Sequence, residues 1–329
     1  MENFDSLFQQ FASIKVGIVG DVMLDTYMWG HVERISPEAP VPIVSLEKKE
    51  QRIGGAGNVA LNIQSAGAQA YVISVTGNDA EAGILKELFT TNHISTQYIV
   101  PSEQRITTNK IRIIGRNQQM MRLDAETIHD LTTEEEQQLL TAFEQFVLTE
   151  KPQVVIIEDY NKGVLTPHVI NSVIAICKDN HIITAVDPKK KNFFAYKGVD
   201  IFKPNLKEVK EGLNLLVPDV NMPQLQTIHQ QLQEKLQHHI SFITLSEKGV
   251  FYQNSTESAI IPSHLRNIAD VSGAGDTVIA VASLVYAATG NIPLMAKVAN
   301  IAGGLVCEEV GTAAIDKQKL LNECKLLLS

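Results

Sequence analysis

Short apolar segments rich in valine and isoleucine alternate along this chain with longer segments of helical character. The apolar segments run from Lys15 to Asp21, Tyr71 to Gly77, Pro152 to Tyr160, His181 to Pro188, Asp200 to Asn205 and Ile240 to Gly249. The helical segments between them cover residues 56–67, 79–92, 132–148, 166–180 and 222–237. Strands that alternate with helices of this length predict a mostly parallel sheet with helices on both faces. We therefore expect a three-layer α/β fold, in one domain that covers residues 1–329.

Several of the expected strands end in polar residues. These are Asp21, Asp159, Asp187, Asn205 and the pair Ser246-Glu247. In parallel α/β sheets, ligands bind outside the carboxyl ends of the strands. We expect these side chains to form the rim of a functional site.

The chain has 329 residues, of which 44% are hydrophobic, and its formal net charge is -9. Because binding to duplexes depends on neutralising phosphates, this charge argues against a nucleic-acid partner. Three widely spaced cysteines without a C-x-x-C pattern argue against a disulfide framework or a zinc site. The sequence has no signal-peptide pattern and no run of 18 apolar residues, so we expect no membrane segment and a cytoplasmic location.

Two regions interrupt the alternation of strands and helices. Residues 25–53 mix short strand-like pieces with prolines and charges. Residues 107–126 alternate polar and apolar side chains around a Gly-Arg-Asn-Gln turn, which indicates a β-hairpin. Both regions predict a small accessory sheet over the strand ends, at about 26–52 and 105–124. We expect this sheet to act as a lid that excludes water.

The ten residues from Asp270 to Ile279 place Gly273, Ala274 and Gly275 directly before Asp276 and an apolar helix. A glycine-rich turn that opens a helix exposes backbone N–H groups at the positive end of the helix dipole, and such groups bind phosphate. An acid in the first turn is placed to act as a general base beside that phosphate. The combination suits phosphoryl transfer to a hydroxyl, although ordinary helix starts use the same residue types.

A second glycine segment, from Gly54 to Gly67, also opens a helical pattern. There the amide of Asn58 offers donors and an acceptor to a sugar hydroxyl. Residues 55–60 also match the G-x-G-x-x-A pattern of dinucleotide-binding proteins, with Asp79 after the next expected strand. Because a charged segment precedes these glycines where that motif needs a strand, a dehydrogenase is the weaker interpretation. The dipeptide Gly-Lys, which a Walker loop requires, does not occur in the chain.

These motifs resemble those of the ribokinase-like (PfkB) carbohydrate kinases. The N-terminal glycine signature of that family is matched at 54–58, its N-x-x-E element at 205–208 and its C-terminal signature at 270–276. The three motifs occur in the order and spacing of the family, and the resemblance covers nearly the whole chain. It implies a ribokinase-like fold with a small β lid, a phosphotransferase activity on a sugar, and ATP and Mg²⁺ as cofactors.

Within that family, the chain is similar to kinases of D-glycero-β-D-manno-heptose 7-phosphate. The similarity is carried by residues 20–25, 34–42, 116–119, 122–124 and 159–165. It implies phosphorylation of the anomeric hydroxyl to the 1,7-bisphosphate, on the route to ADP-heptose for lipopolysaccharide. Such kinases often occur fused to a nucleotidyltransferase domain. Since this chain ends soon after the kinase signature, we expect the stand-alone form without nucleotidyl transfer.

The resemblance assigns residues to the nucleotide and the reacting phosphate. Asp276 matches the catalytic base, and the N–H groups of Gly273, Ala274 and Gly275 would stabilise charge on the moving phosphoryl group. The residues implied for the nucleotide and Mg²⁺ are Asn205, Lys207, Glu208, Ser246, Gly249 and Asn300. Among them Glu208 would hold the metal through water, although an N-x-x-E pair also occurs as an ordinary helix start.

The resemblance also assigns residues to the sugar phosphate. The residues implied for the hydroxyls are Asp21, Asp25, Gly55 and Asn58. The distal phosphate needs a cation, and Arg122, Lys162 and Lys189 are unranked candidates. The two aspartates have a structural alternative, ending a strand and capping a turn, and the cations have the alternative of a solvated face.

Lids of this type often pair between subunits in the family, so the resemblance implies a homodimer through the lid. Exposed strand edges would otherwise invite uncontrolled pairing. The other expected partners are the small-molecule sugar phosphate and ATP. Three alternatives stay open: a kinase for another sugar, sugar phosphate or nucleoside; a catalytically silent nucleotide- or sugar-binding protein; and the dehydrogenase.

Overall fold

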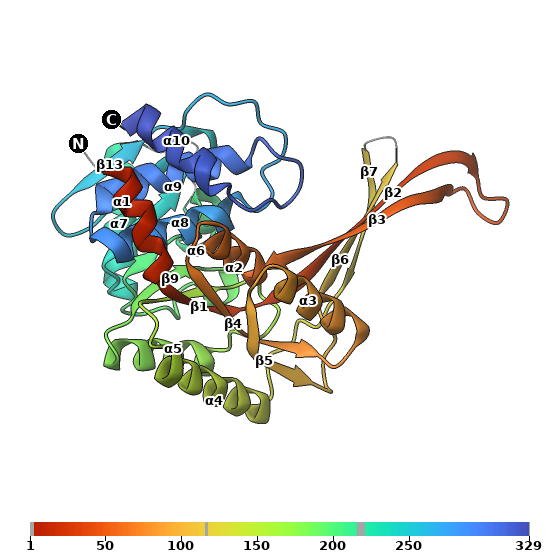
Figure 1. Ribbon diagram of the computed structural model, residues 1–329, viewed down its shortest axis with the longest axis horizontal. Helices are drawn as coiled ribbons and strands as arrows, with labels where there is room; N and C mark the ends of the chain where they lie inside the picture. The colour runs from red at the N-terminus through yellow and green to blue at the C-terminus, as the bar shows by residue number, and fades with distance from the viewer. Residues whose placement is uncertain (1–2, 116–117, 216–220, 329) are drawn as a thin grey trace.

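The computed structural model describes residues 3–115, 118–215 and 221–328. Two β-sheets organise the chain: a nine-stranded sheet inside a helix-covered body, and a four-stranded sheet that extends away from it (Figure 1). The first and last helices, α1 (Phe4–Gln10) and α10 (Lys317–Leu328), lie side by side on the body, far from the tip of the second sheet.

The large sheet has the strand order β13-β12-β11-β10-β9-β8-β1-β4-β5. Its strands are β1 (Lys15–Gly20), β4 (Gln69–Gly77), β5 (Ser95–Ser102), β8 (Val154–Glu158), β9 (Ile183–Asp187), β10 (Ile201–Phe202), β11 (Ile240–Thr244), β12 (Val250–Gln253) and β13 (Ser258–Ile261). Neighbouring strands from β11 through to β5 pair in parallel, whereas β12 and β13 are antiparallel. The mostly parallel sheet confirms the predicted α/β class.

All six segments expected as strands contribute to the large sheet. The expected segment at 240–249 was too long, because β11 ends at Thr244 and a 3-10 helix, Ser246–Lys248, follows it. The strands β5, β12 and β13 were not predicted. They lie at or next to the edges of the sheet, where part of each strand is exposed and the continuous apolar pattern of a central parallel strand is lost.

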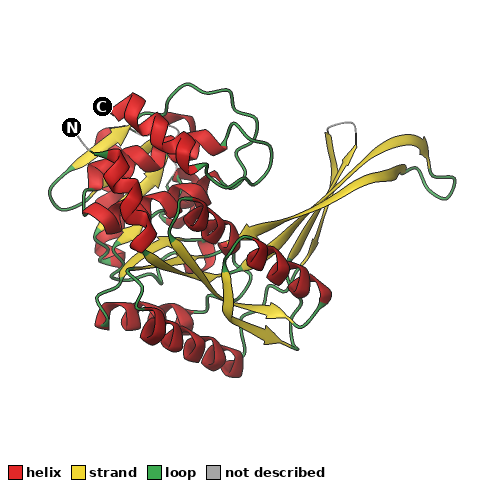
Figure 2. Cartoon of the chain, in the orientation of Figure 1, coloured by secondary structure: helices red, strands yellow, loops and turns green. Residues whose placement is uncertain are grey.

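Helices cover both faces of the large sheet (Figure 2). Besides α1 and α10 they are α2 (Ala56–Ser65), α3 (Ala80–Thr91), α4 (Thr133–Glu150), α5 (Pro167–Asp179), α6 (Leu206–Gly212), α7 (Met222–Leu236), α8 (Ala274–Thr289) and α9 (Ile292–Val306). The sheet side chains alternate between two hydrophobic cores: Ile156 of β8 packs with α2, α8 and α9, whereas Val155 and Ile157 pack with α4, α5 and α7. The alternation follows from the two-residue period of a strand.

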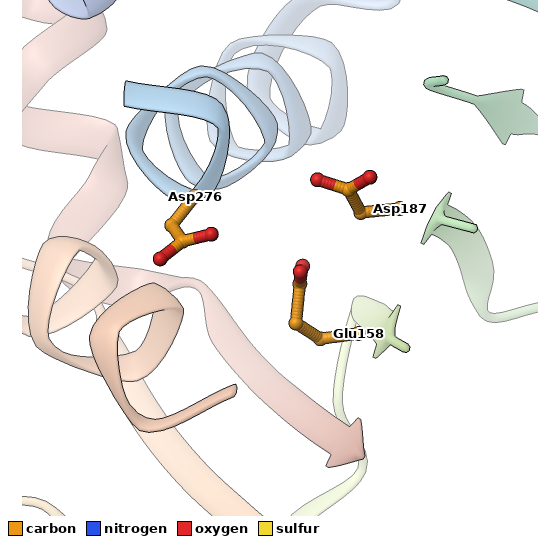
Figure 3. A group of neighbouring side chains, drawn as sticks. All are labelled: Glu158, Asp187 and Asp276. Atoms are coloured by element: carbon orange, nitrogen blue, oxygen red, sulfur yellow. The ribbon is translucent and has the colours of Figure 1, made fainter. Parts of the chain in front are cut away.

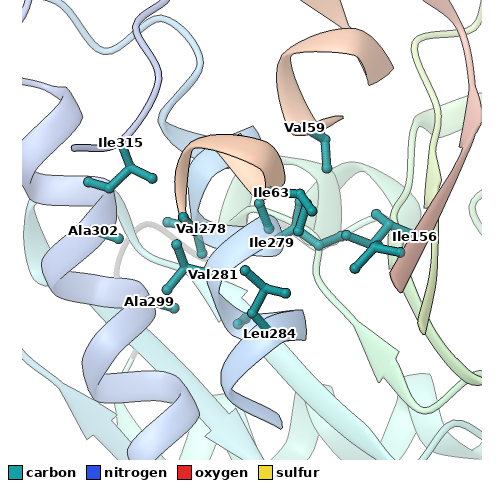
Figure 4. Close-up of a cluster of buried hydrophobic side chains, with 14 of the residues drawn as sticks. Val59, Ile63, Ile156, Val278, Ile279, Val281, Leu284, Ala299, Ala302 and Ile315 are labelled. Atoms are coloured by element: carbon teal, nitrogen blue, oxygen red, sulfur yellow. The ribbon is translucent and has the colours of Figure 1, made fainter. Parts of the chain in front are cut away.

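Helix α8 lies at the centre of the first core, between α2, α9 and strand β8 (Figure 4). Ten consecutive residues, from Asp276 to Val285, are buried. A helix that is buried on all sides shows no amphipathic pattern, which explains the uniformly apolar sequence after Asp276. This packing fixes the position of the Asp276 backbone in the body.

The second sheet has the strand order β3-β2-β6-β7. It comprises β2 (Val22–Ile35), β3 (Pro42–Gly55), β6 (Asn109–Gly115) and β7 (Gln118–Ala125). Strands β6 and β7 pair as the predicted antiparallel hairpin, and β2 pairs in parallel with β6. The turn residues Arg116 and Asn117 of the prediction lie outside the described residues. The strands of this sheet begin and end within a few residues of the segments predicted for the lid.

The roots of β2 and β3 connect the second sheet to the body. Strand β2 begins one residue after Asp21, at the end of β1, and β3 passes directly into α2 at Gly55–Ala56. Both connections lie at the carboxyl end of the large sheet, where the candidate site is found. Among the described residues, no helix is both long enough and apolar enough to span a membrane.

Candidate active site

Asp276 lies in the first turn of α8 and is almost completely buried, with 4% of its surface exposed. Its carboxylate accepts one hydrogen bond from Asn58 Nδ2 at 2.7 Å and another from the Tyr160 hydroxyl at 2.8 Å. Burial raises the pKa of Asp276 to about 6, against the lowering effect of these two donors. A carboxylate with this pKa is well suited to accept a proton near neutral pH.

The glycine-rich turn for which phosphate binding was predicted forms the start of α8. Gly273 is the N-cap and has a φ of 78°, in the left-handed region that favours glycine. A Cβ at this residue would also lie 2.7 Å from Asn58 Nδ2. The N–H of Ala274 already donates to the Val271 carbonyl at 3.3 Å, so Ala274 is a weaker candidate than Gly275 for binding phosphate.

Gly275 faces the charged groups behind this turn. A Cβ here would lie 3.6 Å from Asp187 Oδ2 and 3.7 Å from Lys203 Nζ, which are ordinary contact distances. Packing within the protein therefore does not require glycine at this position. A ligand that approaches the backbone closely would explain why this residue is glycine.

Asn58 lies in the first turn of α2 and is completely buried. Its Nδ2 binds Asp276, while within the described part of the chain its Oδ1 has no hydrogen-bond partner. A buried acceptor without a donor is costly, and a substrate hydroxyl would supply one. Gly55, just before α2, has a φ of 61°, and a Cβ there would lie 2.4 Å from the Asp21 carbonyl. Gly55 therefore shapes the turn that places Asn58.

Asp21 organises the loop after β8. Its carboxylate accepts the backbone N–H groups of Tyr160 at 2.9 Å, Lys162 at 3.1 Å and Val164 at 3.1 Å. Burial and the nearby charge of Asp159 nevertheless keep the pKa of Asp21 above its usual value. With three donors bound, this side chain has the structural role that was the alternative to contact with the sugar.

Asp25 lies on β2, near the root of the second sheet, and is buried. Its Oδ1 pairs with Arg112 of β6. A Cβ at Gly54 would lie 2.3 Å from Asp25 Oδ2, so glycine at that position leaves room for the carboxylate. The contacts of Asp25 are therefore with residues of the second sheet.

Tyr160 is a site residue that the sequence interpretation missed. Its hydroxyl donates a hydrogen bond to Asp276, and two ammonium groups lie close to its ring, Lys110 Nζ at 5.4 Å and Lys189 Nζ at 5.5 Å from the centroid. Lys110 comes from β6, so this ring connects the second sheet with the base. The available signal was the position of Tyr160 directly after Asp159, two residues beyond the end of β8.

A group of buried carboxylates and lysines lies behind Asp276. Carboxylate oxygens of Glu158, Asp187 and Asp276 lie within 4.8 Å of one another (Figure 3). Lys203 Nζ lies 2.8 Å from Asp187 Oδ2, and Lys189 Nζ lies 3.6 Å from Asp187 Oδ1. Burial alone would raise the pKa of Asp187, but the two lysines lower it below its usual value. Glu158 and Lys203 were not among the predicted site residues.

The N-x-x-E element forms the start of α6. Asn205 and Glu208 make a reciprocal capping box: the Asn205 side chain accepts the Glu208 N–H at 2.9 Å, and Glu208 Oε2 accepts the Asn205 N–H at 2.8 Å. Glu208 Oε1 pairs with Lys189 Nζ at 2.6 Å, which joins this element to Asp187. The Lys207 side chain, by contrast, is 85% exposed and lies 3.9 Å from Glu211.

Three other residues were predicted to bind the nucleotide. Ser246 and Gly249 lie between β11 and β12, and Asn300 lies in α9. Ser246 has a φ of 54°, and Gly249 has a φ of 96° in the turn before β12. A Cβ at Gly249 would lie 2.0 Å from the Ile261 carbonyl, so this glycine is required by packing. Asn300 of α9 donates to the Pro262 carbonyl at 2.8 Å and fixes the chain that leads to α8. These contacts do not include the base.

The three cations proposed for the distal phosphate occupy different surroundings. Arg122 on β7 is half exposed and binds Asp124 through two hydrogen bonds of 2.9 Å. Lys162 Nζ pairs with Glu126 Oε2 at 2.6 Å. Lys189 lies in the carboxylate group behind the base. Lys110, whose Nζ lies 5.4 Å from the centroid of the Tyr160 ring, was not among the predicted cations.

The fold and the site define a class of protein. A buried carboxylate at the glycine-rich start of a central helix, with a second sheet rooted beside it, is the arrangement of a ribokinase-like phosphotransferase. The chain belongs to the pfkB family of carbohydrate kinases, whose model matches residues 13–319. It is therefore a phosphotransferase that acts on an alcohol group, and its family uses ATP.

Curated relatives match most of this chain. The bifunctional protein HldE of Methylobacillus flagellatus is 40% identical over 308 residues, which cover 93% of this chain and 62% of that protein. The bifunctional protein HldE of Aliarcobacter butzleri is 39% identical over 298 residues, 90% of this chain and 61% of that protein. The chain thus spans a little less than two thirds of the length of these relatives.

Solved structures of sugar kinases share the fold. Phosphofructokinase-2 from Escherichia coli, in complex with potassium, superposes with a TM-score of 0.77 at 18% identity and covers 95% of this chain and 99% of its own. Ribokinase from Arabidopsis thaliana, complexed with ribose and ATP, gives a TM-score of 0.71 at 15% identity, covering 94% and 98%. At these identities the similarity establishes the ribokinase-like fold.

Proposed function

We propose that this protein transfers the γ-phosphoryl group of ATP to the anomeric hydroxyl of D-glycero-β-D-manno-heptose 7-phosphate. The observation that carries the proposal is the geometry of Asp276, which Asn58 and Tyr160 hold at the N-terminus of α8. The relatives named HldE and the heptose-kinase motifs of the sequence support the choice of sugar. The product, the 1,7-bisphosphate, would enter the synthesis of ADP-heptose and lipopolysaccharide in the cytoplasm.

The proposed reaction requires one proton transfer, from the sugar hydroxyl to the protein. Asp276 accepts the proton of the anomeric hydroxyl as the sugar oxygen attacks the γ-phosphorus, and ADP leaves with the electrons of the broken P–O bond. The N–H of Gly275 and the positive end of α8 stabilise the transferred group. The buried Asn58 Oδ1 accepts a hydrogen bond from a sugar hydroxyl.

The residues near Glu208 fit a nucleotide-bound Mg²⁺. Each Glu208 oxygen already accepts one hydrogen bond, from Asn205 or Lys189, and keeps a second lone pair for a metal-bound water. When bound, Mg²⁺ would neutralise part of the charge on the phosphates. Ser246 and Asn300 would lie along the nucleotide, with their present contacts fixing the loops beside it.

The second sheet would serve as the lid of the sugar site, and we propose that two copies of the chain associate through it. Near its root, Asp25 pairs with Arg112, and Lys110 Nζ lies 5.4 Å from the centroid of the Tyr160 ring. Strand β7 is exposed along its whole described length, and an exposed strand edge favours pairing with another chain. One ribokinase-like domain with this lid would account for residues 1–329.

ATP turnover with Mg²⁺ on the heptose 7-phosphate tests the proposal, with fructose 6-phosphate and ribose in parallel. We expect ADP release with the heptose and its loss in Asp276→Asn. Preference for another sugar or a nucleoside would support the kinase activity but contradict the assignment of heptose 7-phosphate as the substrate. ATP binding without sugar-dependent turnover on a broad substrate panel would overturn the proposed reaction and favour a binding function.

A further inference from the structure

Arg52 of β3 joins the second sheet to a loop of the body that begins 258 residues further along the chain. Its Nη1 donates hydrogen bonds to the carbonyl oxygens of Val310 at 2.9 Å and Thr312 at 3.3 Å. Between these carbonyls, Gly311 has a φ of 75°, and a Cβ there would lie 2.5 Å from Arg52 Nη1. Glycine at this position therefore leaves room for the guanidinium, and the loop fits closely around it.

The same loop is attached to the turn at the start of α8. The N–H of Gly311 donates to Asp270 Oδ2 at 3.0 Å. Asp270 Oδ1 accepts the N–H of Ser272 at 2.9 Å and its hydroxyl at 2.8 Å, one residue before the N-cap Gly273. A Cβ at Gly273 would lie 3.4 Å from Thr312 Cγ2, so the loop also packs close to the turn. A continuous series of contacts therefore connects the second sheet with the start of α8.

On the sheet, two further contacts hold the Arg52 side chain. Its Nε donates to Glu50 Oε1 at 2.6 Å, and its guanidinium carbon lies 5.1 Å from the centroid of the Tyr27 ring. The Tyr27 ring stacks on Trp29, with centroids 5.4 Å apart and an angle of 16° between the ring planes. Trp29 is the only tryptophan of the chain. Its fluorescence therefore reports on the part of the second sheet that Arg52 contacts.

We propose that Arg52 is a positioning residue, which links the placement of the second sheet to the turn at the start of α8. The inference rests on the proposed function, in which the sheet forms the sugar side of the site and the turn holds the transferred phosphate. A phosphate group at the turn would fix the contact between Asp270 and Gly311, and Arg52 would pass this constraint to the sheet. Coupling of this kind is a free energy shared by the two sites.

Binding of a non-hydrolysable ATP analogue with Mg²⁺, in the absence of sugar, tests the proposal. Calorimetry measures the affinity, and Trp29 fluorescence measures the response of the sheet. In the wild type we expect the analogue to bind and to change the Trp29 emission. Arg52→Met leaves the loop without its guanidinium, so we expect binding to be about fivefold weaker or more and most of the emission change to be lost.

Gly311→Ala breaks the same contact from the other side, because its Cβ would displace the guanidinium. We expect it to lose the emission change as Arg52→Met does. The double variant should bind the analogue no more weakly than the weaker single variant, since both changes remove one contact. Circular dichroism shows whether each variant is folded.

Lys48→Met is the matched control. Lys48 lies on the same strand, pairs with the same Glu50 carboxylate at 2.7 Å and has its Nζ 4.8 Å from the centroid of the Trp29 ring. Within the described structure, its side-chain contacts are with the second sheet and not with residues 310–312. Lys48→Met should therefore shift the resting emission of Trp29 and retain both the nucleotide-dependent change and the affinity.

The outcomes separate this inference from the proposed function. The inference is overturned if the analogue binds without changing the Trp29 emission, or if Arg52→Met and Gly311→Ala keep both the change and the affinity. It is also overturned if Lys48→Met loses the change to the same extent, because the response would then be local to Trp29. These results leave the proposed function standing, whereas a wild type that binds no analogue would contradict both.

Discussion

At the scale of single residues, opposing effects set the basicity of Asp276. Burial raises its pKa, and the hydrogen bonds from Asn58 and Tyr160 lower it, so that the value comes to about 6. The base must be ionised to accept a proton. Sugar-dependent turnover is therefore expected to fall about tenfold for each pH unit below 6.

Replacement of Tyr160 by phenylalanine removes one of these two donors. A hydrogen bond to a charged group contributes about 1.5–3 kcal/mol, and one pKa unit corresponds to about 1.4 kcal/mol. We expect the acidic limb of the kcat/KM profile to move up by about one pH unit or more. Tyr252→Phe, far from the base in β12, is the matched control. An unchanged limb in Tyr160→Phe would show that the hydroxyl does not tune the base.

Lys203 has a structural role that stability measurements can separate from catalysis. Its ammonium is buried against Asp187, at 2.8 Å from Oδ2. Lys203→Met leaves the carboxylate without its closest partner, and such a loss costs about 3–5 kcal/mol of unfolding free energy. Lys207→Met, at a side chain that is 85% exposed, should change it by less than about 0.5 kcal/mol. Urea denaturation of both variants measures the difference.

At the scale of elements, helix α8 has a left-handed glycine at each end. Gly273 has a φ of 78° and Gly290 a φ of 64°. A Cβ at Gly290 would meet no described atom within 4 Å, whereas one at Gly273 would press on Asn58 Nδ2. Alanine at either glycine costs about 1–2 kcal/mol of backbone strain, but only one of the two changes touches the base.

Gly273→Ala and Gly290→Ala therefore form a matched pair. Both should lower the free energy of unfolding by a similar amount, measured with urea. Gly273→Ala alone should reduce kcat, by about tenfold or more, because it displaces the Asn58 amide that holds Asp276. Equal kcat values in the two variants would count against a role for this contact.

The elements also show how far the sequence could predict the structure. The central strands were predictable because a parallel strand is apolar on both faces, and the start of α8 because glycines and an acid precede a long apolar run. The hydrogen-bond partners of Asp21 could not be predicted, because they lie about 140 residues away along the chain. Glu158 was missed because the sequence pattern placed the polar end of that strand at Asp159, one residue later than the end of β8.

At the scale of the whole molecule, the second sheet exposes apolar side chains far from the body. Among them are Leu46 on β3, 58% exposed, and Met121 on β7, 54% exposed. Exposed apolar residues that gather on one element favour association. The same sheet contributes Lys110 at the site, so association and catalysis share a structural element.

Leu46→Lys combined with Met121→Lys tests association through this sheet. We expect the variant to sediment as a monomer at concentrations where the wild type sediments as a dimer, with an unchanged circular dichroism spectrum. Leu265→Lys changes a fully exposed leucine on the body and should sediment like the wild type. A dimer that survives the double change would place the interface elsewhere.

The continuity of β2 and β3 has a mechanical consequence. Each strand spans 14 residues, from the candidate site to the far end of the second sheet, and their pairing has register irregularities only in its outer half, at Trp29–Gly30 and Val32–Arg34. In a dimer formed through that sheet, tilting these two strands at one end would move the other end as a lever does. Binding of sugar and self-association would then be reciprocally coupled, so the apparent affinity for the sugar would rise with the concentration of the protein itself.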